Sequence, residues 1–215
     1  MSPRKLVLLF SFVVLLPFAA AQSDQKAPLH KNEIGLLLGG AKTSEFTVTG
    51  QNRKISFGTG LTFQANYARR LAGSSGVGVY LEVPFLAAPL VDISSEVAEV
   101  PANYASLFVT PSLRLQLAPG GGFSPWFSVG GGYARFDSSK ELQDGSPNAG
   151  RIAANKSAIQ FGGGADFHVP VKLIVPFKLR LELRDIVSGK ANYNVDTGSG
   201  RQHNLVFSGG FVVSF

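Results

Sequence analysis

The side chains with the clearest chemical potential are ionisable residues that alternate with apolar ones. Residues 177–184 read FKLRLELR, so four charged side chains share one face of an extended strand. Mixed charges that face a common interior must pair, because an isolated buried ion is very costly to desolvate. The candidate interior charges are Glu82, Arg114, Asp166, Lys178, Arg180, Glu182 and Arg184, with Glu33 in the same phase.

The histidines give little support for catalysis or metal binding. His30, His168 and His203 lie far apart in the sequence, and none has a second histidine at metal-ligand spacing. Cysteine is absent, and no glycine run is followed by the Lys-Ser/Thr of a phosphate loop. A Ser–His–acid triad assembled from separate strands is the alternative, since triads depend on geometry and not on sequence order. We expect no enzymatic activity, no cofactor and no metal.

The elements that position these residues are strands. In ISFGTGLTFQANY, at residues 55–67, and in LVFSGGFVVSF, at 205–215, apolar side chains recur at every second position, which no helix would place on one face. The candidate strands lie at 32–41, 54–68, 76–86, 104–117, 125–136, 156–169, 177–187 and 203–215.

The connections between these strands alternate in length. Those at 42–53, 87–103, 137–155 and 188–202 are long and polar, whereas those at 69–75, 118–124 and 170–176 are short. This alternation is typical of bacterial outer-membrane barrels. The predicted fold is all-β, an eight-stranded antiparallel up-and-down transmembrane β-barrel with both ends of the chain on the same side. Its narrow lumen is filled by side chains, so we expect a plug of paired charges; a narrow pore for small solutes is the alternative.

The beginning of the chain predicts export. Arg4 and Lys5 precede an apolar run that ends in Ala19-Ala20-Ala21, the pattern of a secretory signal peptide over residues 1–21. Residues 22–31 are then a short tail, and 32–215 form one barrel domain. The formal charge of +6 is spread along the chain, and with export it argues against a nucleic-acid partner.

Aromatic residues are concentrated near the ends of the candidate strands, as in the two girdles of a membrane barrel. The expected girdles are Tyr67, Phe167, Phe177 and Phe215 at one end, and Phe85, Tyr104, Tyr133 and Phe136 at the other. Pro84 and Pro111 fall inside strands, where a bulge or a short irregular stretch is expected at each. The glycine pairs and triplets in neighbouring strands indicate strong local curvature, with a hollow in the lumen as the alternative.

The chain resembles the small eight-stranded outer-membrane barrels, a group that includes the transmembrane domain of the outer-membrane protein A family. The resemblance covers residues 32–215 and rests on the strand alternation, the loop asymmetry and the ending LVFSGGFVVSF. It implies that Phe215, in phase with Phe211, is the assembly signal that the barrel insertion machinery reads. We expect this chain to lack the peptidoglycan-binding domain found in many members of that family. The His-x-Ser pair of the lipid A deacylases in this group is missing too, because the histidines read HKN, HVP and HNL.

These observations predict a structural, envelope-maintenance or surface-interaction protein of the bacterial outer membrane. Its expected partners are outer-membrane lipid, the insertion machinery and an extracellular ligand that contacts the long connections. A barrel enzyme acting on lipid and a soluble lipocalin-like barrel are the less favoured alternatives, the latter because it would place its apolar face inward.

Overall fold

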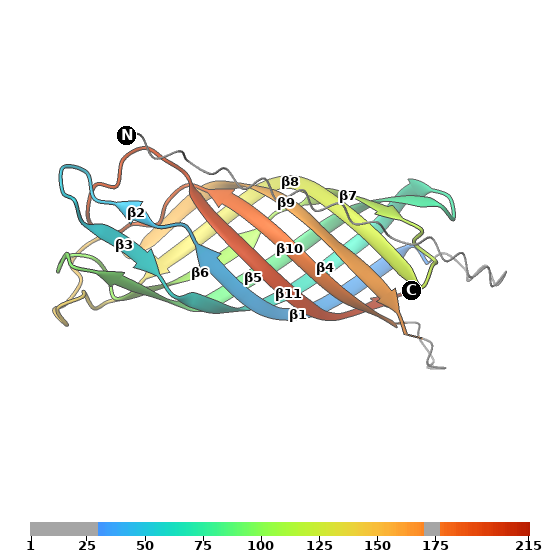
Figure 1. The fold of residues 1–215 in the computed structure, drawn as a ribbon, viewed down its shortest axis with the longest axis horizontal. Helices are drawn as coiled ribbons and strands as arrows, with labels where there is room; N and C mark the ends of the chain where they lie inside the picture. Colours follow the sequence, from blue (N-terminus) through green and yellow to red (C-terminus); the bar gives the residue numbers. More distant parts are fainter. Residues whose placement is uncertain (1–29, 170–176) are drawn as a thin grey trace, which may run out of the picture.

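The computed structural model describes residues 30–169 and 177–215, and within them the chain is built from strands (Figure 1). None of the described residues belongs to a helix long and apolar enough to cross a membrane. The strands are β1 (Asn32–Thr43), β2 (Phe46–Thr47), β3 (Lys54–Phe57), β4 (Thr59–Gly73), β5 (Val77–Ser95), β6 (Asn103–Val109), β7 (Ser112–Leu117), β8 (Phe123–Ser138), β9 (Ala153–His168), β10 (Phe177–Ser188) and β11 (Gln202–Ser214).

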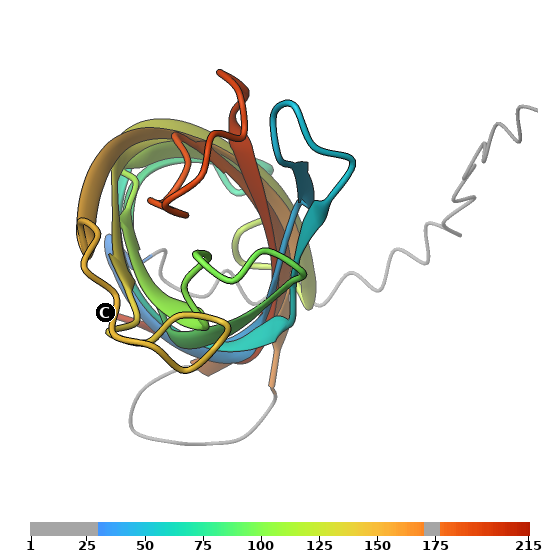
Figure 2. The same ribbon diagram turned by 90° about the vertical axis from the view of Figure 1, so that its left-hand side faces the viewer.

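The strands form a closed antiparallel barrel with eight strand positions. β3 and β4 together occupy one position, interrupted at Gly58, and β6 and β7 occupy another, interrupted at Thr110 and Pro111. The strands at each position pair with their sequence neighbours, and β1 closes the ring by pairing with β11 over Glu33–Thr43. The end view shows this ring (Figure 2). The predicted eight-stranded antiparallel barrel is confirmed.

The candidate long connections all lie at one end of the barrel, which we call the outer end, but they are shorter than predicted. The connections there are 44–53, which contains β2, and 96–102, 139–152 and 189–201. The largest correction concerns 87–103, because 87–95 continue β5. A register shift between Ala88 and Val91, around Pro89, makes even-numbered side chains face inward before it and odd-numbered ones after it. At the inner end the connections are 74–76 and 118–122, while the predicted turn 170–176 lies outside the described residues.

Pro84 and Pro111, the two prolines predicted to lie inside strands, flank one irregularity. β5 runs through Pro84 without a register shift, and the interruption lies opposite it, at Thr110 and Pro111. Thr110 donates its N–H to the carbonyl oxygen of Pro84 over 3.4 Å, and Gly131 donates to the carbonyl oxygen of Pro111 over 3.1 Å. The expected irregularity is therefore present at Pro111 and absent in β5 at Pro84.

Glycines in neighbouring strands allow the backbones to approach closely. A Cβ atom on Gly39 would lie 2.0 Å from the carbonyl oxygen of Phe207, and one on Gly132 would lie 2.0 Å from that of Val109. Both contacts are with the backbone of a neighbouring strand, which cannot give way as a flexible side chain would. These glycines therefore fit the interpretation of strong local curvature.

The outer wall of the barrel is apolar. Leu36, Phe63, Phe127, Leu181 and Phe207 are among the many large apolar side chains that are about half exposed on the outward face. An exposed surface of this extent is that of a barrel whose solvent is lipid.

The predicted girdles are partly wrong. Six of the eight expected residues lie on the outward phase, namely Tyr67, Phe167, Phe177, Phe215, Phe85 and Tyr133. The other two, Tyr104 and Phe136, are buried inside the barrel, with 1% and 0% of their surface exposed. They share the inward phase with Phe108 and Ala134, and an aromatic ring suits an apolar interior as well as a membrane interface.

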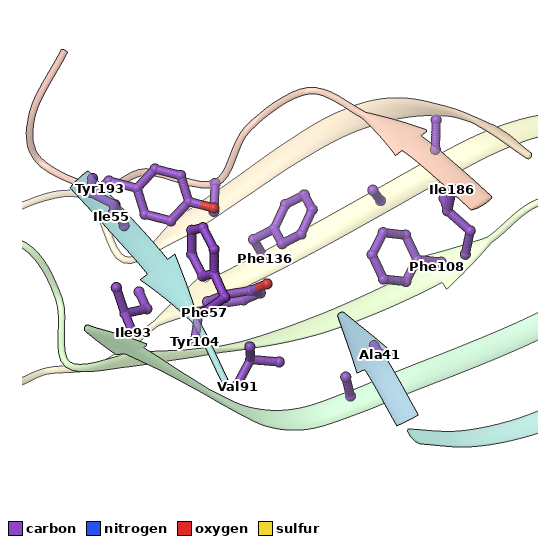
Figure 3. Close-up of a cluster of buried hydrophobic side chains, with 14 of the residues drawn as sticks. Ala41, Ile55, Phe57, Val91, Ile93, Tyr104, Phe108, Phe136, Ile186 and Tyr193 are labelled. Atoms are coloured by element: carbon purple, nitrogen blue, oxygen red, sulfur yellow. The ribbon is translucent and has the colours of Figure 1, made fainter. Parts of the chain in front are cut away.

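The interior of the barrel is divided into a charged half and an apolar half. Toward the outer end, Phe57, Tyr104, Phe108 and Phe136 form a chain of edge-on aromatic contacts, with ring centroids 5.7–5.9 Å apart (Figure 3). Toward the inner end, the interior is filled by ionisable and amide side chains. The charged half was predicted, and the apolar half was not.

Candidate functional site

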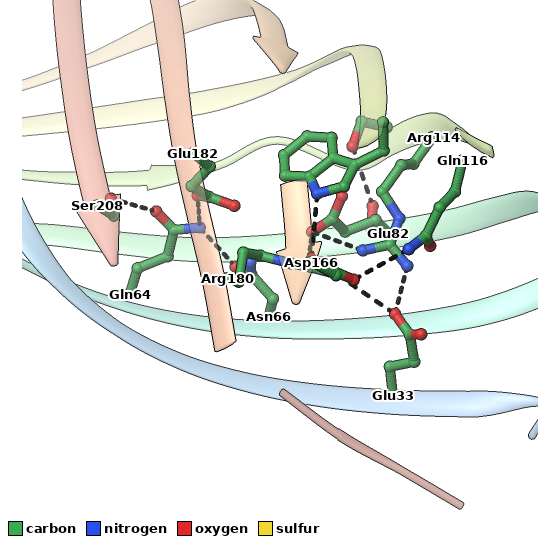
Figure 4. A network of polar contacts seen from close by, with 12 residues as sticks. Glu33, Gln64, Asn66, Glu82, Arg114, Gln116, Asp166, Arg180, Glu182 and Ser208 are labelled. Carbon is green, nitrogen blue, oxygen red and sulfur yellow. Dashed lines mark hydrogen bonds and ion pairs between the residues drawn. The ribbon is translucent and has the colours of Figure 1, made fainter. Parts of the chain in front are cut away.

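The charged half of the lumen is the candidate site, and several strands contribute to it. β10 supplies Lys178, Arg180, Glu182 and Arg184, because strand alternation sends these four inward while Leu179, Leu181 and Leu183 face outward. The remaining members are Glu33 from β1, Glu82 from β5, Arg114 from β7 and Asp166 from β9. The structure therefore places all seven candidate interior charges, and Glu33, within one layer. Figure 4 labels Glu33, Glu82, Arg114, Asp166, Arg180 and Glu182 of this layer.

Arg180 lies at the centre of this layer. Its Nε and Nη2 donate to the two carboxylate oxygens of Asp166 over 2.6 and 2.8 Å, and the two residues are register partners on adjacent strands. Its Nη1 lies 3.4 Å from Glu82 Oε1, and the same Nη2 lies 3.5 Å from Glu33 Oε2. A bidentate guanidinium–carboxylate pair fixes both the distance and the plane of the two groups, so Arg180 ties β10 to β9 and, across the lumen, to β1 and β5.

Arg184 makes a second bidentate pair. Its Nε and Nη2 donate to Glu182 over 2.6 and 2.9 Å, and Nη2 also lies 3.0 Å from Glu82 Oε1. Arg184 and Glu182 are two positions apart on β10, so their side chains point to the same face. Glu82 accepts from both Arg180 and Arg184 and thereby joins the two bidentate pairs.

Glu33 connects the layer to its inner edge. One carboxylate oxygen pairs with Arg114 and the other accepts from Lys178 Nζ over 2.8 Å. Lys178 is the one cation of the eight-residue layer that retains measurable contact with solvent, with 12% of its side chain exposed.

Two aromatic side chains also contact the charged layer. The ring of Trp126 lies within 5.1–5.7 Å of the guanidinium carbons of Arg114, Arg180 and Arg184, and its Nε1 donates to Asp166 over 3.3 Å. The ring of Tyr80 lies 4.5 Å from the guanidinium carbon of Arg114. Sequence reasoning missed both rings, although their even-numbered positions place them in phase with Glu82 and with Ser128.

The layer balances its own charge. Its four carboxylates come from Glu33, Glu82, Asp166 and Glu182, and its four cations from Arg114, Lys178, Arg180 and Arg184. Seven of these residues expose at most 3% of their surface, and Lys178 lies at the rim. A layer of paired charges of this kind holds neighbouring strands in register, although Arg114 Nε and Nη1, Arg184 Nη1 and Glu82 Oε2 have no hydrogen-bond partner among the described residues.

Comparisons with known proteins bear on the fold. No protein-family model and no curated protein matches the sequence. Among solved structures, the chain is similar to Neisserial surface protein A (NspA), with a TM-score of 0.54 and 13% identity over 86% of this chain and 97% of that one. It is also similar to the outer-membrane protein OprG from Pseudomonas aeruginosa, with a TM-score of 0.52 and 13% identity over 86% and 96%. The fold is that of the small bacterial outer-membrane β-barrels.

At the outer end of the barrel, four connections form a hydrogen-bonded group that we call the cap: 44–53, 96–102, 139–152 and 189–201. These connections are hydrogen-bonded to one another. Thr49 donates its N–H to the carbonyl oxygen of Asp196 over 2.8 Å, and the side-chain amide of Asn194 donates to the carbonyl oxygen of Glu99 over 3.0 Å. They were predicted only as long polar loops. Val97 and Val100, apolar residues within one of these polar connections, are both buried. Such isolated apolar residues were the sequence signal that the connections pack on a core.

Tyr193 anchors the cap to the barrel. Its ring packs 5.5 Å from Phe57 and 5.8 Å from Phe46, and its hydroxyl donates to Gln202 Oε1 over 2.6 Å. Burial raises the pKa of the Tyr193 phenol well above its usual range, with a smaller contribution from the nearby Tyr104. The cap therefore holds a neutral phenol at the outer mouth of the lumen.

The histidines lie outside this layer. His203 is exposed on the outward face of β11, where its Nδ1 lies 2.9 Å from Asp185 Oδ2 of β10. Ser44 Oγ accepts from the backbone N–H of His203 over 3.2 Å, so this contact is with the backbone and not with the ring. No group of three or more His, Cys, Asp or Glu side chains in the described part of the chain is arranged to hold a metal ion.

The expected assembly residues lie on the wall at the inner end. Phe211 and Phe215 are both outward and about half exposed. Phe215 exchanges two backbone hydrogen bonds of 2.9 Å with Asn32, which extends the β1–β11 seam by one pair. Its role in assembly stays a prediction.

Proposed function

We propose that this chain is an integral protein of the bacterial outer membrane with a structural or surface-interaction role, and that it neither conducts solutes nor catalyses a reaction. The observation that carries the proposal is the neutral layer of eight paired charges across the inner half of the lumen. The apolar wall supports the membrane location, because large apolar side chains at this density need lipid around them.

The lumen is closed by two different kinds of contact. A hydrated ion would have to break buried pairs such as Arg180–Asp166, and each unpaired buried charge would then carry a large desolvation cost. At the outer end, it would have to separate the aromatic chain from Phe57 to Phe136 and displace Tyr193.

Under this proposal, the function of the barrel lies on its surfaces. The wall would contact lipid, Phe215 would be read by the insertion machinery during assembly, and the cap would present 44–53, 96–102, 139–152 and 189–201 to an extracellular ligand. The cap is hydrogen-bonded to itself, so it would offer a preformed surface rather than four independent loops.

Planar-bilayer recording on the purified full-length protein tests the closed lumen. We expect no steady conductance from the wild type, and none from Arg180→Gln, which removes one positive charge from the layer but keeps a polar side chain at this position. Reproducible single-channel steps, with an ion selectivity that shifts in Arg180→Gln or Arg184→Gln, would overturn the proposal and establish a narrow pore. Fractionation of cell envelopes, with a heat-dependent shift on detergent gels, tests the location independently.

A further inference from the structure

The wall of the barrel has an unpaired strand edge at the outer end of β9. The ladder between β9 and β10 ends at Ala158 and Ser188, and the last backbone bond runs from Gly189 N–H to the carbonyl oxygen of Ser157 over 3.3 Å. β9 continues for five more residues, from Ala153 to Ser157, paired on one side only with β8. This edge lies beside the connection 189–201.

Two backbone donors of this edge point away from β8. Ser138 N–H donates to the carbonyl oxygen of Ile152 over 2.9 Å, so the even-numbered backbone groups of this segment face β8. Backbone groups alternate sides along a strand, and the N–H groups of Ala153 and Asn155 therefore face the open side. Among the residues that the structure describes, neither N–H has a hydrogen-bond partner.

A hollow of about 600 Å³ lies against this edge. Its lining includes Arg151, Ala153, Asn155, Lys156, Ala191 and Asn192. Asn192 closes the hollow on its outer side by donating its side-chain amide to the carbonyl oxygen of Arg151 over 2.7 Å. The stem of Lys156 lies against Gly189, where a Cβ atom would come within 2.9 Å of Lys156 Cδ.

The hollow is electropositive and its cations are free. Within 30–169 and 177–215, neither Arg151 nor Lys156 forms an ion pair, and no carboxylate lines the hollow. Asp137, the register partner of Ala153, is engaged by Arg135 through bonds of 2.8 and 3.0 Å. Asn155 Oδ1 accepts from the Tyr133 hydroxyl over 2.6 Å, which leaves the Asn155 amide nitrogen as a donor.

We propose that this hollow is a binding site for a phosphate-type oxyanion. Arg151 and Lys156 supply the charge, and the N–H groups of Ala153 and Asn155 supply backbone donors, the combination by which proteins hold phosphate. On the same strand, Ile159 and Phe161 belong to the apolar wall, so the hollow lies at its polar border. A phosphate there comes either from a lipid headgroup or from solution. The lipid source depends on the proposed membrane location, whereas the site itself depends only on the fold.

The site is tested with inorganic phosphate on full-length protein in a maltoside detergent, at constant ionic strength. We expect the amide resonances of Ala153 and Asn155 to shift saturably. The variant Arg151→Gln/Lys156→Gln should weaken the apparent affinity at least tenfold. The matched control Arg53→Gln/Lys54→Gln, which removes the same charge where the connection 44–53 meets β3, should leave it unchanged.

The source is tested in vesicles of digalactosyldiacylglycerol, which lacks phosphate, with increasing fractions of phosphatidylglycerol. Shifts of the same two amides with phosphatidylglycerol, lost in Arg151→Gln/Lys156→Gln, would identify a lipid headgroup, and shifts with inorganic phosphate alone would identify a free anion. The proposal is overturned by absence of a response to both probes. An equal response in the double variant and its control overturns it too. Because the readout is local to two amides, it is independent of whether the lumen conducts.

Discussion

Glu182 and Arg184 depend on each other inside the lumen. Glu182→Ala leaves Arg184 with only Glu82 Oε1 as a carboxylate partner, although its guanidinium is fully buried. Removing one member of a buried pair exposes the other to the full desolvation cost. We expect the unfolding free energy to fall by about 3–5 kcal/mol, measured by urea titration of the protein in detergent or lipid.

The double variant Glu182→Leu/Arg184→Leu separates pairing from packing. If the single change acts by leaving a charge unpaired, replacing both members by apolar side chains restores most of the lost stability. A double variant as unstable as Glu182→Ala would mean that the polar contacts of this layer hold the strands directly.

Tyr193 predicts a pH dependence for the cap. Its pKa is raised in the folded protein, so folding keeps the phenol protonated where the unfolded chain would ionise. The contribution of Tyr193 is therefore complete below the unfolded pKa near 10 and is lost as pH rises from there toward the folded pKa. Between about pH 9 and about pH 11, we expect the wild type to lose more stability than Tyr193→Phe. Parallel losses in the two proteins would contradict this.

The free energy lost when an arginine replaces a leucine of the wall should depend on the depth of that leucine in the membrane. Leu181, near the middle of the strand, and Leu117, at the inner end of β7, are each 50% exposed on the outward face. We expect Leu181→Arg to destabilise the barrel by about 2–4 kcal/mol and Leu117→Arg by about 0–1 kcal/mol. Unfolding titrations in lipid give both values, and equal costs would mean that the wall does not span a membrane at this depth.

The strands could be predicted where the alternation is unbroken. FKLRLELR gives both faces of β10 directly, since every second residue carries a charge. β5 could not be followed beyond Ala88, because the irregularity around Pro89 reverses which positions face inward. Val91 and Ile93 therefore lay out of phase with the strand that they continue, and a polar loop was predicted in their place.

The sequence predicted which residues form the candidate site, but not which of them pair with one another. Period-two phase sends Arg180 and Asp166 to the same interior, but only the register between β9 and β10 makes them direct partners. Tyr104 and Phe136 were assigned to the wall because alternation gives relative faces, and their strands offer apolar residues on both. The open edge at Ala153 depends on where β10 ends, which a loop composition does not indicate.

Assembly of the whole barrel predicts a distinct role for the last residue. We expect deletion of Phe215 to lower the amount of protein in the outer membrane, whereas Phe215→Ala separates the ring from the two backbone bonds to Asn32. If the ring is the signal, both variants fail alike. A loop change such as Asp144→Asn serves as the control. Unchanged outer-membrane levels of both Phe215 variants would exclude the assembly role.

The cap and the charged layer lie at different places along the lumen, so we expect removal of the cap to leave the charged layer intact. Replacing 190–200 by a short glycine–serine linker removes Tyr193 and much of the cap, while the charged layer lies toward the opposite end of the barrel. We therefore expect this variant to remain non-conducting in planar bilayers. Steady currents from it would locate the barrier in the cap and not in the charges.

Trp126 is the one tryptophan of the sequence, and it lies inside the lumen among three guanidinium groups. Its indole is 5% exposed, although the neighbouring wall residue Phe127 faces outward. Tryptophan fluorescence from this protein therefore comes from the interior of the barrel rather than from the lipid-contacting wall, which lipid-soluble quenchers reach first. Emission would stay unresponsive to brominated or spin-labelled lipid chains of matched depth, and would change only when the strands around Arg180 separate.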